Sequence, residues 1–490
     1  MCLFDFGTVY FEHWVVSDAE PTVEVLLRLL AERDALIAGL QATVARLEGR
    51  VAELEARLGM NSTNSHLPPS SDGPGKPVKP APRSLRRKSG KKPGGQPGHP
   101  GAALSLTDDP DEIVRHAPER CAGCGVGLRG RPVTRVVRRQ VFDLPEPAPL
   151  RVTEHQLVAK RCWCGVETMA EAPPGVQAPV SYGPRLKAVT VYLQFAQFCS
   201  RLRTAQAVKD LFGVPISAAT VSGFGTKAAA GLGGFVTTVT DLLRAAPVAG
   251  FDETSMRVAG GNWWVHTACT PQLTLLTVHR RRGTEGADAA GVLPEFAGVA
   301  VHDAWAPYDT YDQATHALCG AHVLRELQAV TGTAATGGQW AARLAECLRT
   351  LKHAADDARE HSKTLDPVWL AGQVRAYTAA AQVGFNVSSA RANEIDKKHH
   401  ALARRLLDRK DDILRFAYDL RVPFDNNTSE QSIRMVKVRQ KISGTMRIPQ
   451  GAQDFVTIRS YLQTAAKQGK NALDVLIALF EARPWLPSTT

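Results

Sequence analysis

The sequence predicts a multidomain α+β protein, on three observations. Apolar residues with heptad spacing stand near the N-terminus, and two close pairs of cysteines flank strand-like segments further along. Three more strand-like segments are then followed by a helix and a buried strand. The chain has 490 residues, 44% of them hydrophobic, which is enough for several domains with at least one sizeable core.

The charge of the chain narrows the classes of partner. Its formal net charge of +11 at pH 7 favours a polyanion, either nucleic acid or an anionic membrane surface. No apolar run approaches the ~18 residues of a spanning helix. Residues 1–22 stay unassigned, and they lack the basic region and apolar stretch of a secretory signal. We therefore expect a cytoplasmic protein that binds DNA and no membrane.

An amphipathic helix is predicted over residues 23–60. Its apolar residues recur at alternating steps of three and four, the spacing of a coiled-coil seam. The seam consists of Ile37, Leu40, Val44, Leu47, Val51, Leu54 and Leu58, with Leu26 and Leu30 extending it upstream. Such a helix can pack on its own domain or on a second copy. Because the seam exceeds three heptads and has charged flanks, we expect a coiled coil that forms a homo-oligomer, at least a dimer.

Residues 61–104 have the Ser, Asn, Pro and Gly content of a linker. Within them, residues 76–92 carry eight basic side chains and no acidic one, so they cannot form a core. This stretch can be a solvated tether or an arm that contacts DNA and releases counterions. Its charge density favours the arm. The DNA-binding residues predicted there are Arg86, Arg87, Lys88, Lys91 and Lys92.

Two pairs of cysteines mark residues 105–175 as a small β domain. Cys121 and Cys124 enclose two residues, Cys162 and Cys164 enclose one, and a glycine follows each pair. Strand-like segments at 133–144 and 150–162 lie between the pairs. Four thiolates on two turns are the ligand set of a structural Zn²⁺ site, and the alternative is four unpaired cysteines in a reducing cell. The tight, repeated spacing favours zinc.

Residues 176–240 are predicted to form a helix-turn-helix-like region that binds DNA. One helix ends at a turn containing Gly213, and a second opens at Ser217. Many helical hairpins share this pattern, but the basic charge of the chain favours DNA. The second helix, near Thr220 to Lys227, would enter the groove.

An α/β core is predicted over residues 245–475. Three strand-like segments within residues 247–281 precede a helical stretch and a buried strand that ends with Asp303. This is the strand order of an RNase H-like core. A charged helical insertion is expected over about residues 328–420, and residues 476–490 are expected to be a C-terminal tail.

Two acidic residues stand at the edges of apolar strands in this core. Asp252 follows VAGF in the first strand, and Asp303 follows GVAVH in the fourth. Adjacent strands of such a sheet would bring the two carboxylates together. Carboxylates are hard ligands for Mg²⁺ or Mn²⁺, and two such ions ~4 Å apart stabilise the attacking and leaving oxygens of phosphodiester cleavage.

A third carboxylate is expected from Glu430. Asp425 or Asn426 can cap a helix that begins just before it. Arg434 and Lys437 follow by four and seven residues and share its helical face. A carboxylate beside two cations suits a metal ion together with a DNA phosphate, so Arg434 and Lys437 are predicted DNA contacts.

Each of these acids can instead be an ordinary solvated side chain. The apolar strands that precede Asp252 and Asp303 argue against that alternative. Glu253 and Asp309 are the main competing acids. In a regular strand Glu253 would point to the face opposite Asp252, and His302 to the face opposite Asp303.

These segments together resemble the insertion sequence 66 family of bacterial transposases. The resemblance covers almost the whole chain, and the combination of motifs is specific although no single motif is. The matching motifs are NSTNS, LPPSSD, GGQPGHPG, CAGCG, CWCG, FDET, VHDAWAPY, LCGAHVLREL and PFDNNTSEQSIRMVKVRQKISG.

The resemblance implies a DDE transposase with a zinc-finger region and a helix-turn-helix-like segment. By position, Asp252, Asp303 and Glu430 are its first, second and third acids. Cys319 and His322 resemble the C-x-x-H signature that supports the active site after the second acid in many DDE enzymes, although Cys319 can equally be a core residue. After Glu430 the chain has RQKISGTMR where the common family version has an RKNWLF-like stretch. The need for accessory element proteins therefore stays open.

The implied function is metal-dependent cleavage of DNA at terminal inverted repeats, followed by strand transfer, at a bacterial nucleoid. Two other hypotheses stay open. A structure-selective nuclease, such as a junction resolvase, would cleave branched DNA without terminal-repeat specificity. A zinc-containing transcription regulator with an inactive catalytic fold would show no metal-dependent nicking.

Overall fold

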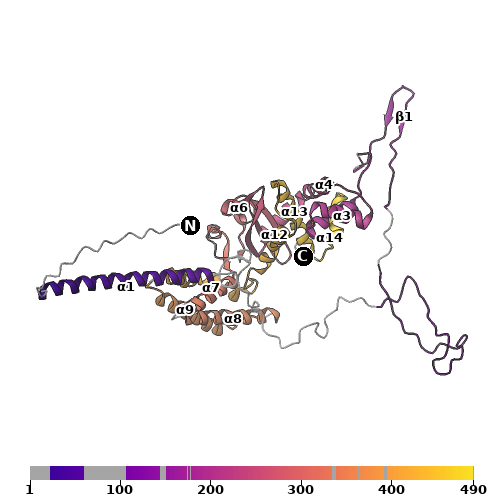
Figure 1. Ribbon diagram of the computed structural model, residues 1–490. Coiled ribbons are helices and arrows are strands. Elements are labelled where there is room, and N and C mark those ends of the chain that lie inside the picture. Colours follow the sequence, from indigo (N-terminus) through magenta and orange to yellow (C-terminus); the bar gives the residue numbers. More distant parts are fainter. Residues whose placement is uncertain are drawn as a thin grey trace, which may run out of the picture. The chain divides into compact units, whose positions relative to one another are not determined.

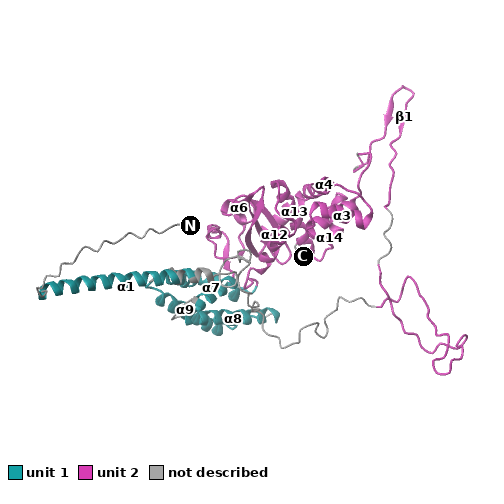
Figure 2. Ribbon diagram, in the orientation of Figure 1, with its two compact units in different colours: residues 1–82, 320–420 teal, residues 83–319, 421–490 magenta. Residues whose placement is uncertain are grey.

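The computed structural model describes residues 22–59, 106–143, 150–173, 175–176, 178–333, 338–361, 363–390 and 394–488. The chain divides into two compact units, residues 1–82 with 320–420 and residues 83–319 with 421–490 (Figure 2). The predicted DNA-binding arm lies outside the described residues. Its five named side chains are Arg86, Arg87, Lys88, Lys91 and Lys92.

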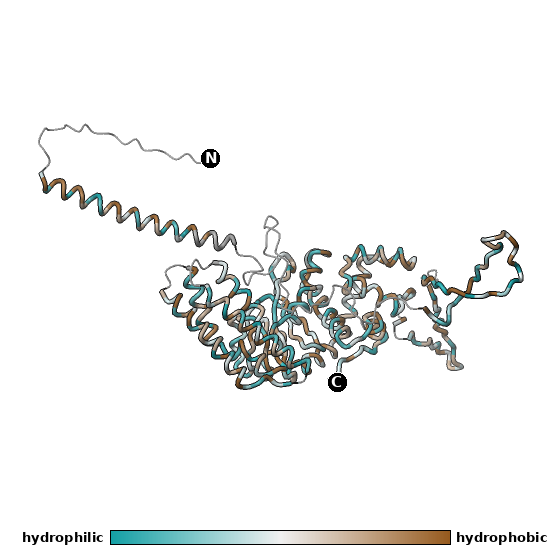
Figure 3. Tube along the Cα trace, turned by 90° about the horizontal axis from the view of Figure 1, so that it is seen from below, coloured by the Kyte–Doolittle hydropathy of each residue, from teal (hydrophilic) through white to brown (hydrophobic). Residues whose placement is uncertain are grey.

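The first unit contains the predicted N-terminal helix, α1 (Val23–Gly59; Figure 1). Every side chain of α1 that the structure describes is exposed, including the heptad residues. Ile37 is 43% exposed and Leu40 57% exposed. Hydrophobic residues recur along the coloured part of this helix (Figure 3). Within the described part of the chain, α1 therefore has an apolar seam that no other element buries.

The described residues between 320 and 420, which belong to the same unit, are mainly helical. The helices are α7 (Gly320–Thr333), α8 (Gln339–Glu360), α9 (Pro367–Val387), α10 (Glu394–Asp408) and α11 (Lys410–Tyr418). The Asp366 side chain accepts from the Trp369 N–H and caps α9, which begins at a proline. A Cβ atom on Gly384 would lie 2.4 Å from the Trp340 ring, so glycine there lets α9 approach α8 closely.

The second unit is built on a mixed five-stranded sheet with the order β5-β4-β3-β6-β7. The first three strands form an antiparallel meander, and β6 and β7 run parallel to β3. This arrangement confirms the predicted α+β class with a mixed central sheet. The strands are β3 (Val248–Val258), β4 (Gly261–Cys269), β5 (Thr274–His279), β6 (Val299–His302) and β7 (Thr315–Leu318). Helix α6 (Thr284–Ala289) lies in the crossover from β5 to β6.

Two C-terminal helices pack on this sheet, α12 (Asn427–Ser443) on β3 and α13 (Pro449–Lys467) on β5. The α13 hydroxyls of Ser460 and Thr464 accept from the backbone N–H groups of Leu276 and Thr274, at 2.8 and 3.0 Å. An edge strand has unpaired backbone groups, so α13 closes this edge of the sheet.

Helices N-terminal to the sheet complete the second unit. They are α2 (Pro184–Val191), continued by the π-helical turn Tyr192–Ala196, then α3 (Arg201–Phe212), α4 (Ala218–Ala230) and α5 (Gly233–Arg244). Gly213 ends α3 with a left-handed φ of 68°, and Ser217 caps α4 by accepting from the Thr220 N–H. The two helices and the turn thus form where the sequence predicts them.

The predicted C-terminal tail is partly helical. Helix α14 (Ala472–Phe480) begins with Asn471 as its cap, and Leu476 and Leu479 on it are buried. The expected start of the tail at residue 476 is therefore too early. The apolar segment is long enough for two turns of helix, which pack on α2.

The cysteine-rich region contains less sheet than the sequence suggests. Its only described strands are β1 (Ala159–Arg161) and β2 (Glu167–Met169), paired antiparallel. Residues 133–143 have a strand-like composition but form no strand, because no described segment pairs with their backbone. None of the helices in the described part of the chain combines the length and apolarity that a bilayer crossing requires.

Candidate active site

The register of two parallel strands brings the first two predicted acids to one level of the sheet. Gly250 on β3 pairs with Val301 on β6. Asp252 and Asp303 each follow two residues later. Asp252 lies within β3 and Asp303 is the first residue after β6, so the register brings the two residues to neighbouring positions at the end of β6. The Oδ1 atom of Asp303 accepts from the Trp305 N–H at 3.0 Å, which fixes the turn that follows β6.

Asp252 lies in a strongly acidic, buried environment. Burial raises the pKa of its carboxyl well above the usual range, and the negative charges of Glu253, Asp303 and Glu430 raise it further. Its Oδ1 atom accepts from the Glu253 N–H at 2.8 Å. Asp252 is thus near enough to Asp303 and Glu430 for their charges to act on it, although one oxygen from each of the three carboxylates does not lie within 4.8 Å of the others. A cation beside Asp252 would offset these charges.

A buried polar network holds the start of α12 against β3. The Asn426 side chain donates to the Phe251 carbonyl at 2.6 Å and accepts from the Ser429 hydroxyl at 2.6 Å. A Cβ atom on Gly250 would lie 2.4 Å from Ser429 Oγ and 2.6 Å from Asn426 Oδ1. Glycine at this position therefore lets the helix approach the strand next to Asp252.

The N-terminus of α12 is capped differently from what the sequence predicts. Asn426 occupies the N-cap position of α12, but its side chain bonds to β3 and Ser429 and caps no backbone N–H. Asp425 instead accepts from the Asn427 N–H at 3.1 Å. Neither the role of Asn426 nor that of Gly250 was predicted, because both depend on contacts between distant segments.

Cys319 belongs to the same network. It is 1% exposed, and its sulfur accepts from the Asn426 backbone N–H at 3.2 Å. The Cys269 sulfur lies 3.2 Å from Ser429 Oγ. His322 is located three positions after Cys319, in the first turn of α7, which belongs to the other unit. The structure thus gives Cys319 a packing role beside the start of α12.

Glu430 and the two cations after it occupy α12. Glu430 is half-buried in the first turn, where the helix dipole favours a negative charge. Arg434 is exposed. Lys437 instead donates to the Ser255 carbonyl and, at 2.8 Å, to the Ser255 hydroxyl, and burial lowers the pKa of its ammonium. Lys437 therefore holds α12 to β3, and its contact with DNA stays a prediction.

The opposite face of β3 carries a second acid, Glu253. From the sequence, Glu253 is only an alternative to the three predicted acids. The Glu253 side chain is 2% exposed and accepts from Arg282 at 2.7 Å and from the Tyr308 hydroxyl at 2.6 Å. The Arg282 guanidinium also lies over the rings of Trp264 and Trp305. Glu253 is thus paired with partners of its own, although its charge still raises the pKa of Asp252. Asp252, its neighbour on β3, is directed to the other face.

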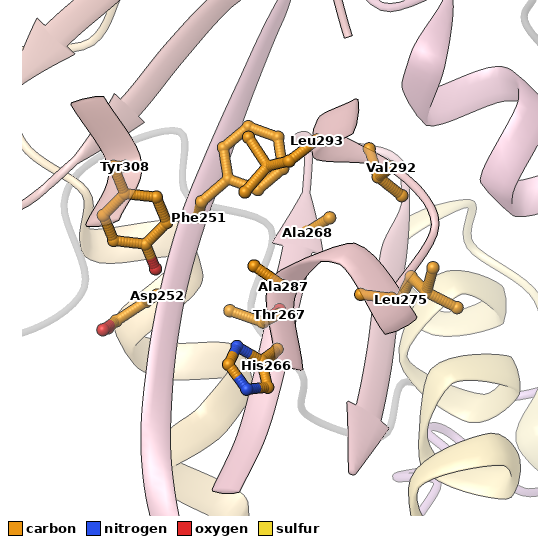
Figure 4. A pocket seen from close by; sticks show the side chains of 11 residues that line it. Phe251, Asp252, His266, Thr267, Ala268, Leu275, Ala287, Val292, Leu293 and Tyr308 are labelled. Carbon is orange, nitrogen blue, oxygen red and sulfur yellow. The ribbon is translucent and has the colours of Figure 1, made fainter. Parts of the chain in front are cut away.

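A pocket lies beside these strands, between the sheet and the α6 segment. Its lining is largely apolar and includes Phe251 and Leu293, with His266 and Tyr308 at its polar end (Figure 4). Figure 4 shows the Asp252 carboxylate directed away from His266. Asp252 is nevertheless one of the residues that line the pocket, which therefore lies directly beside this acid.

The three acids suit divalent hard ions by their donor type. Mg²⁺ and Mn²⁺ prefer carboxylate oxygens as ligands. A cation beside Asp252 would offset the burial and the neighbouring negative charges that raise its pKa. Asp252, Asp303 and Glu430 would hold it.

The two cysteine pairs form turns of similar design. Backbone N–H groups of Cys124 and Gly123 lower the pKa of the Cys121 thiol, and the Cys164 N–H lowers that of Cys162. Such turns suit thiolate ligands of Zn²⁺. Among the described residues, however, no three of the sulfurs of Cys121, Cys124, Cys162 and Cys164 lie within 4.8 Å of one another. The structure forms each half of the predicted zinc site but does not bring the halves together.

Comparison with known proteins gives two family matches. Residues 18–105 match a family of unknown function, DUF6444. No curated protein matches the chain. Residues 179–454, more than half of the 490, match the model described as Transposase IS66 family. This match spans the helices before the sheet, the sheet and turn with Asp252 and Asp303, the helix α12 with Glu430, and the start of α13. The chain therefore belongs to the Transposase IS66 family.

Proposed function

We propose that this transposase binds the terminal inverted repeats of an insertion element, cleaves DNA there and joins the free end to target DNA. Asp252, Asp303 and Glu430 are the proposed catalytic residues and the ligands of two Mg²⁺ or Mn²⁺ ions. The observation that carries the proposal is the parallel pairing of β3 with β6, which brings Asp252 near Asp303, where burial and the charges of the other acids raise the pKa of Asp252. Carboxyl groups whose charged form is disfavoured in this way are typical of catalytic sites, and a metal ion held there would stabilise the charged form.

The proposed role of the three acids is to hold the metal ions in position beside the scissile phosphate. Bound divalent ions would polarise the scissile phosphate and activate water, and later the 3′-hydroxyl, as nucleophile. Asp252 lies on β3 and Asp303 directly follows the parallel strand β6, and the Asn426 network holds the start of α12, from which Glu430 would reach the ions. No covalent bond between protein and DNA is required, so no serine or tyrosine nucleophile is assigned.

DNA recognition is assigned to basic and helical segments outside the acid cluster. Arg434 is exposed one helical turn after Glu430, where it can contact a phosphate. The basic residues of 76–92, a zinc-bound cysteine region and the α3–α4 pair would bind the repeats, with Arg86, Arg87, Lys88, Lys91 and Lys92 as backbone contacts. Lys227 on α4 is exposed, as a groove-entering helix requires.

A homo-oligomer is proposed to form through α1. Its seam repeats over more than three heptads, and its described side chains are exposed. Pairing with α1 of another copy would bury the seam. The same assembly would hold two element ends together for joining.

Strand transfer on synthetic element ends tests this proposal. Repeat-ended duplexes, Mg²⁺ and the full chain should yield nicked and joined products. Asp252→Asn, Asp303→Asn and Glu430→Gln should each reduce both products by at least about a hundredfold, since each removes a ligand charge. Glu285→Gln is the matched control, because Glu285 is 70% exposed on α6 and only pairs with Arg281.

The choice of substrate separates the alternatives. Preference for repeat ends over branched junctions supports a transposase, and the reverse preference indicates a structure-selective nuclease. Specific binding without metal-dependent nicking would indicate a regulator. Wild-type activity in any of the three acid variants would refute that residue's assignment.

A further inference from the structure

Beside the proposed catalytic acids lies a second group of metal-ligand side chains. It consists of His302 at the end of β6, Asp309 in the 3₁₀ helix Ala306–Thr310, and His316 on β7. One ligand atom from each residue lies within 4.8 Å of the others. His302 is the last residue of β6 and its ring stacks on Tyr308, and none of the three residues is one of the proposed catalytic acids. The group is therefore distinct from the acid cluster.

Strand pairing explains how the two histidines meet. His316 pairs with Ala300, and His302 follows Ala300 by two residues, so both side chains lie on one face. Their atoms Nε2 of His302 and Nδ1 of His316 are 2.9 Å apart. The His302 ring is fully buried and stacks on Tyr308 with its centroid 4.6 Å away. Tyr308 is in turn held by Glu253.

The hydrogen bond on the other side of the His302 ring fixes its tautomer. Its Nδ1 atom contacts the Asp303 backbone carbonyl, which can only accept, so Nδ1 carries the proton. The Nε2 lone pair then faces His316 and Asp309. Metal-binding histidines characteristically donate their second N–H to a backbone carbonyl in this way, and the bond orients the ring.

From this geometry we propose that His302, Asp309 and His316 bind one divalent transition-metal ion, with Zn²⁺ as the representative. Two imidazoles and one carboxylate suit Zn²⁺ and leave a fourth position for water, whereas Mg²⁺ prefers oxygen ligands alone. Asp309 is exposed and His316 half-buried, so the ion can enter from solvent. The ion would tie β6 and β7 to the turn after Asp303 and hold that acid in place.

Zinc binding by the full-length chain tests the proposal. The four cysteines of the zinc-finger region are first replaced by serine, so that they cannot contribute ions. We expect this chain to retain one Zn²⁺ after gel filtration, measured by elemental analysis, and both His316→Gln and Asp309→Asn to lose it. His279→Gln is the control, since His279 lies on β5 of the same sheet and only accepts from Arg281.

Melting curves separate loss of the ion from loss of the fold. In chelator, His316→Gln and its parent should melt at similar temperatures, and added Zn²⁺ should raise the Tm of the parent alone. With Co²⁺ in place of Zn²⁺, the bound ion should show no thiolate charge-transfer band. Equal zinc retention in all variants, a thiolate band, or no retention by the parent would each overturn the proposal. None of these measurements depends on DNA cleavage, so they stand apart from the proposed function.

Discussion

At the scale of single residues, Asp252 shows how the site balances stability against charge. Burial and the charges of Glu253, Asp303 and Glu430 raise the pKa of its carboxyl. The folded, metal-free protein therefore binds a proton that the unfolded chain releases near pH 4, where aspartate ordinarily titrates at about 3.9. It follows that stability falls as pH rises from that value through the raised pKa.

The substitution Asp252→Asn should abolish the loss of stability that the wild-type protein shows as the pH rises. In chelator at neutral pH we expect the variant to melt a few degrees above wild type, with the difference shrinking toward pH 4, measured by scanning calorimetry. Mg²⁺ should then raise the Tm of wild type but not of the variant. Glu285→Gln should follow wild type throughout. If the variant instead melts below wild type in chelator at neutral pH, the charged Asp252 carboxylate does not destabilise the metal-free protein.

Arg434 and Lys437 lie on the same helical face but should respond differently to substitution. Lys437→Met leaves the Ser255 carbonyl and hydroxyl without their donor, which should cost about 1–3 kcal/mol of unfolding free energy. Arg434→Gln should change stability by less than about 0.5 kcal/mol. It should instead weaken DNA binding and reduce the salt slope of the binding constant by about 1.

Denaturation by urea and binding titrations at several salt concentrations measure the two effects. If Arg434→Gln leaves the salt slope unchanged, Arg434 does not contact a phosphate. If Lys437→Met is as stable as wild type, the bond to Ser255 does not hold α12 on the sheet.

At the scale of elements, the contact of α12 with β3 determines the site. Gly250→Ala would place a methyl group 2.4 Å from Ser429 Oγ and 2.6 Å from Asn426 Oδ1. We expect it to cost about 1–3 kcal/mol and to displace Glu430, with loss of cleavage in a folded protein. Gly283→Ala is the matched control, because nothing lies within 4 Å of its added carbon. Cleavage at wild-type rate by Gly250→Ala would contradict this role for the contact.

Part of this element-scale picture was predictable from sequence. Apolar runs ending in Asp252 and Asp303 predicted strands, and their order predicted which would be neighbours. The Asn426–Phe251 bond and the Glu253–Tyr308 bond join residues far apart in the chain, so local pattern could not reveal them. Conversely, residues 133–143 have the β-branched composition of a strand, yet a strand needs a pairing partner, and none of the described segments provides one.

At the scale of the whole molecule, α1 should set the oligomeric state. Leu40→Glu combined with Leu47→Glu puts charges into the seam and should convert the oligomer to monomer in light-scattering measurements. Ala42→Glu combined with Ala45→Glu adds the same charge outside the seam and should leave the oligomer intact. If both double variants remain oligomeric, another surface holds the copies together. Monomers should retain nicking but lose joining of two element ends.

The central claim is that Asp252, Asp303 and Glu430 hold the ions that drive cleavage. The most direct measurement is cleavage of repeat-ended DNA by Asp303→Cys in Mg²⁺ and in Mn²⁺. A thiolate is a poor ligand for Mg²⁺ and a better one for Mn²⁺, so activity should be lost in Mg²⁺ and partly restored in Mn²⁺. Asp303→Ala should remain inactive in both ions. Wild-type cleavage by either variant in Mg²⁺, or equal loss in both ions by a folded Asp303→Cys, would contradict the claim.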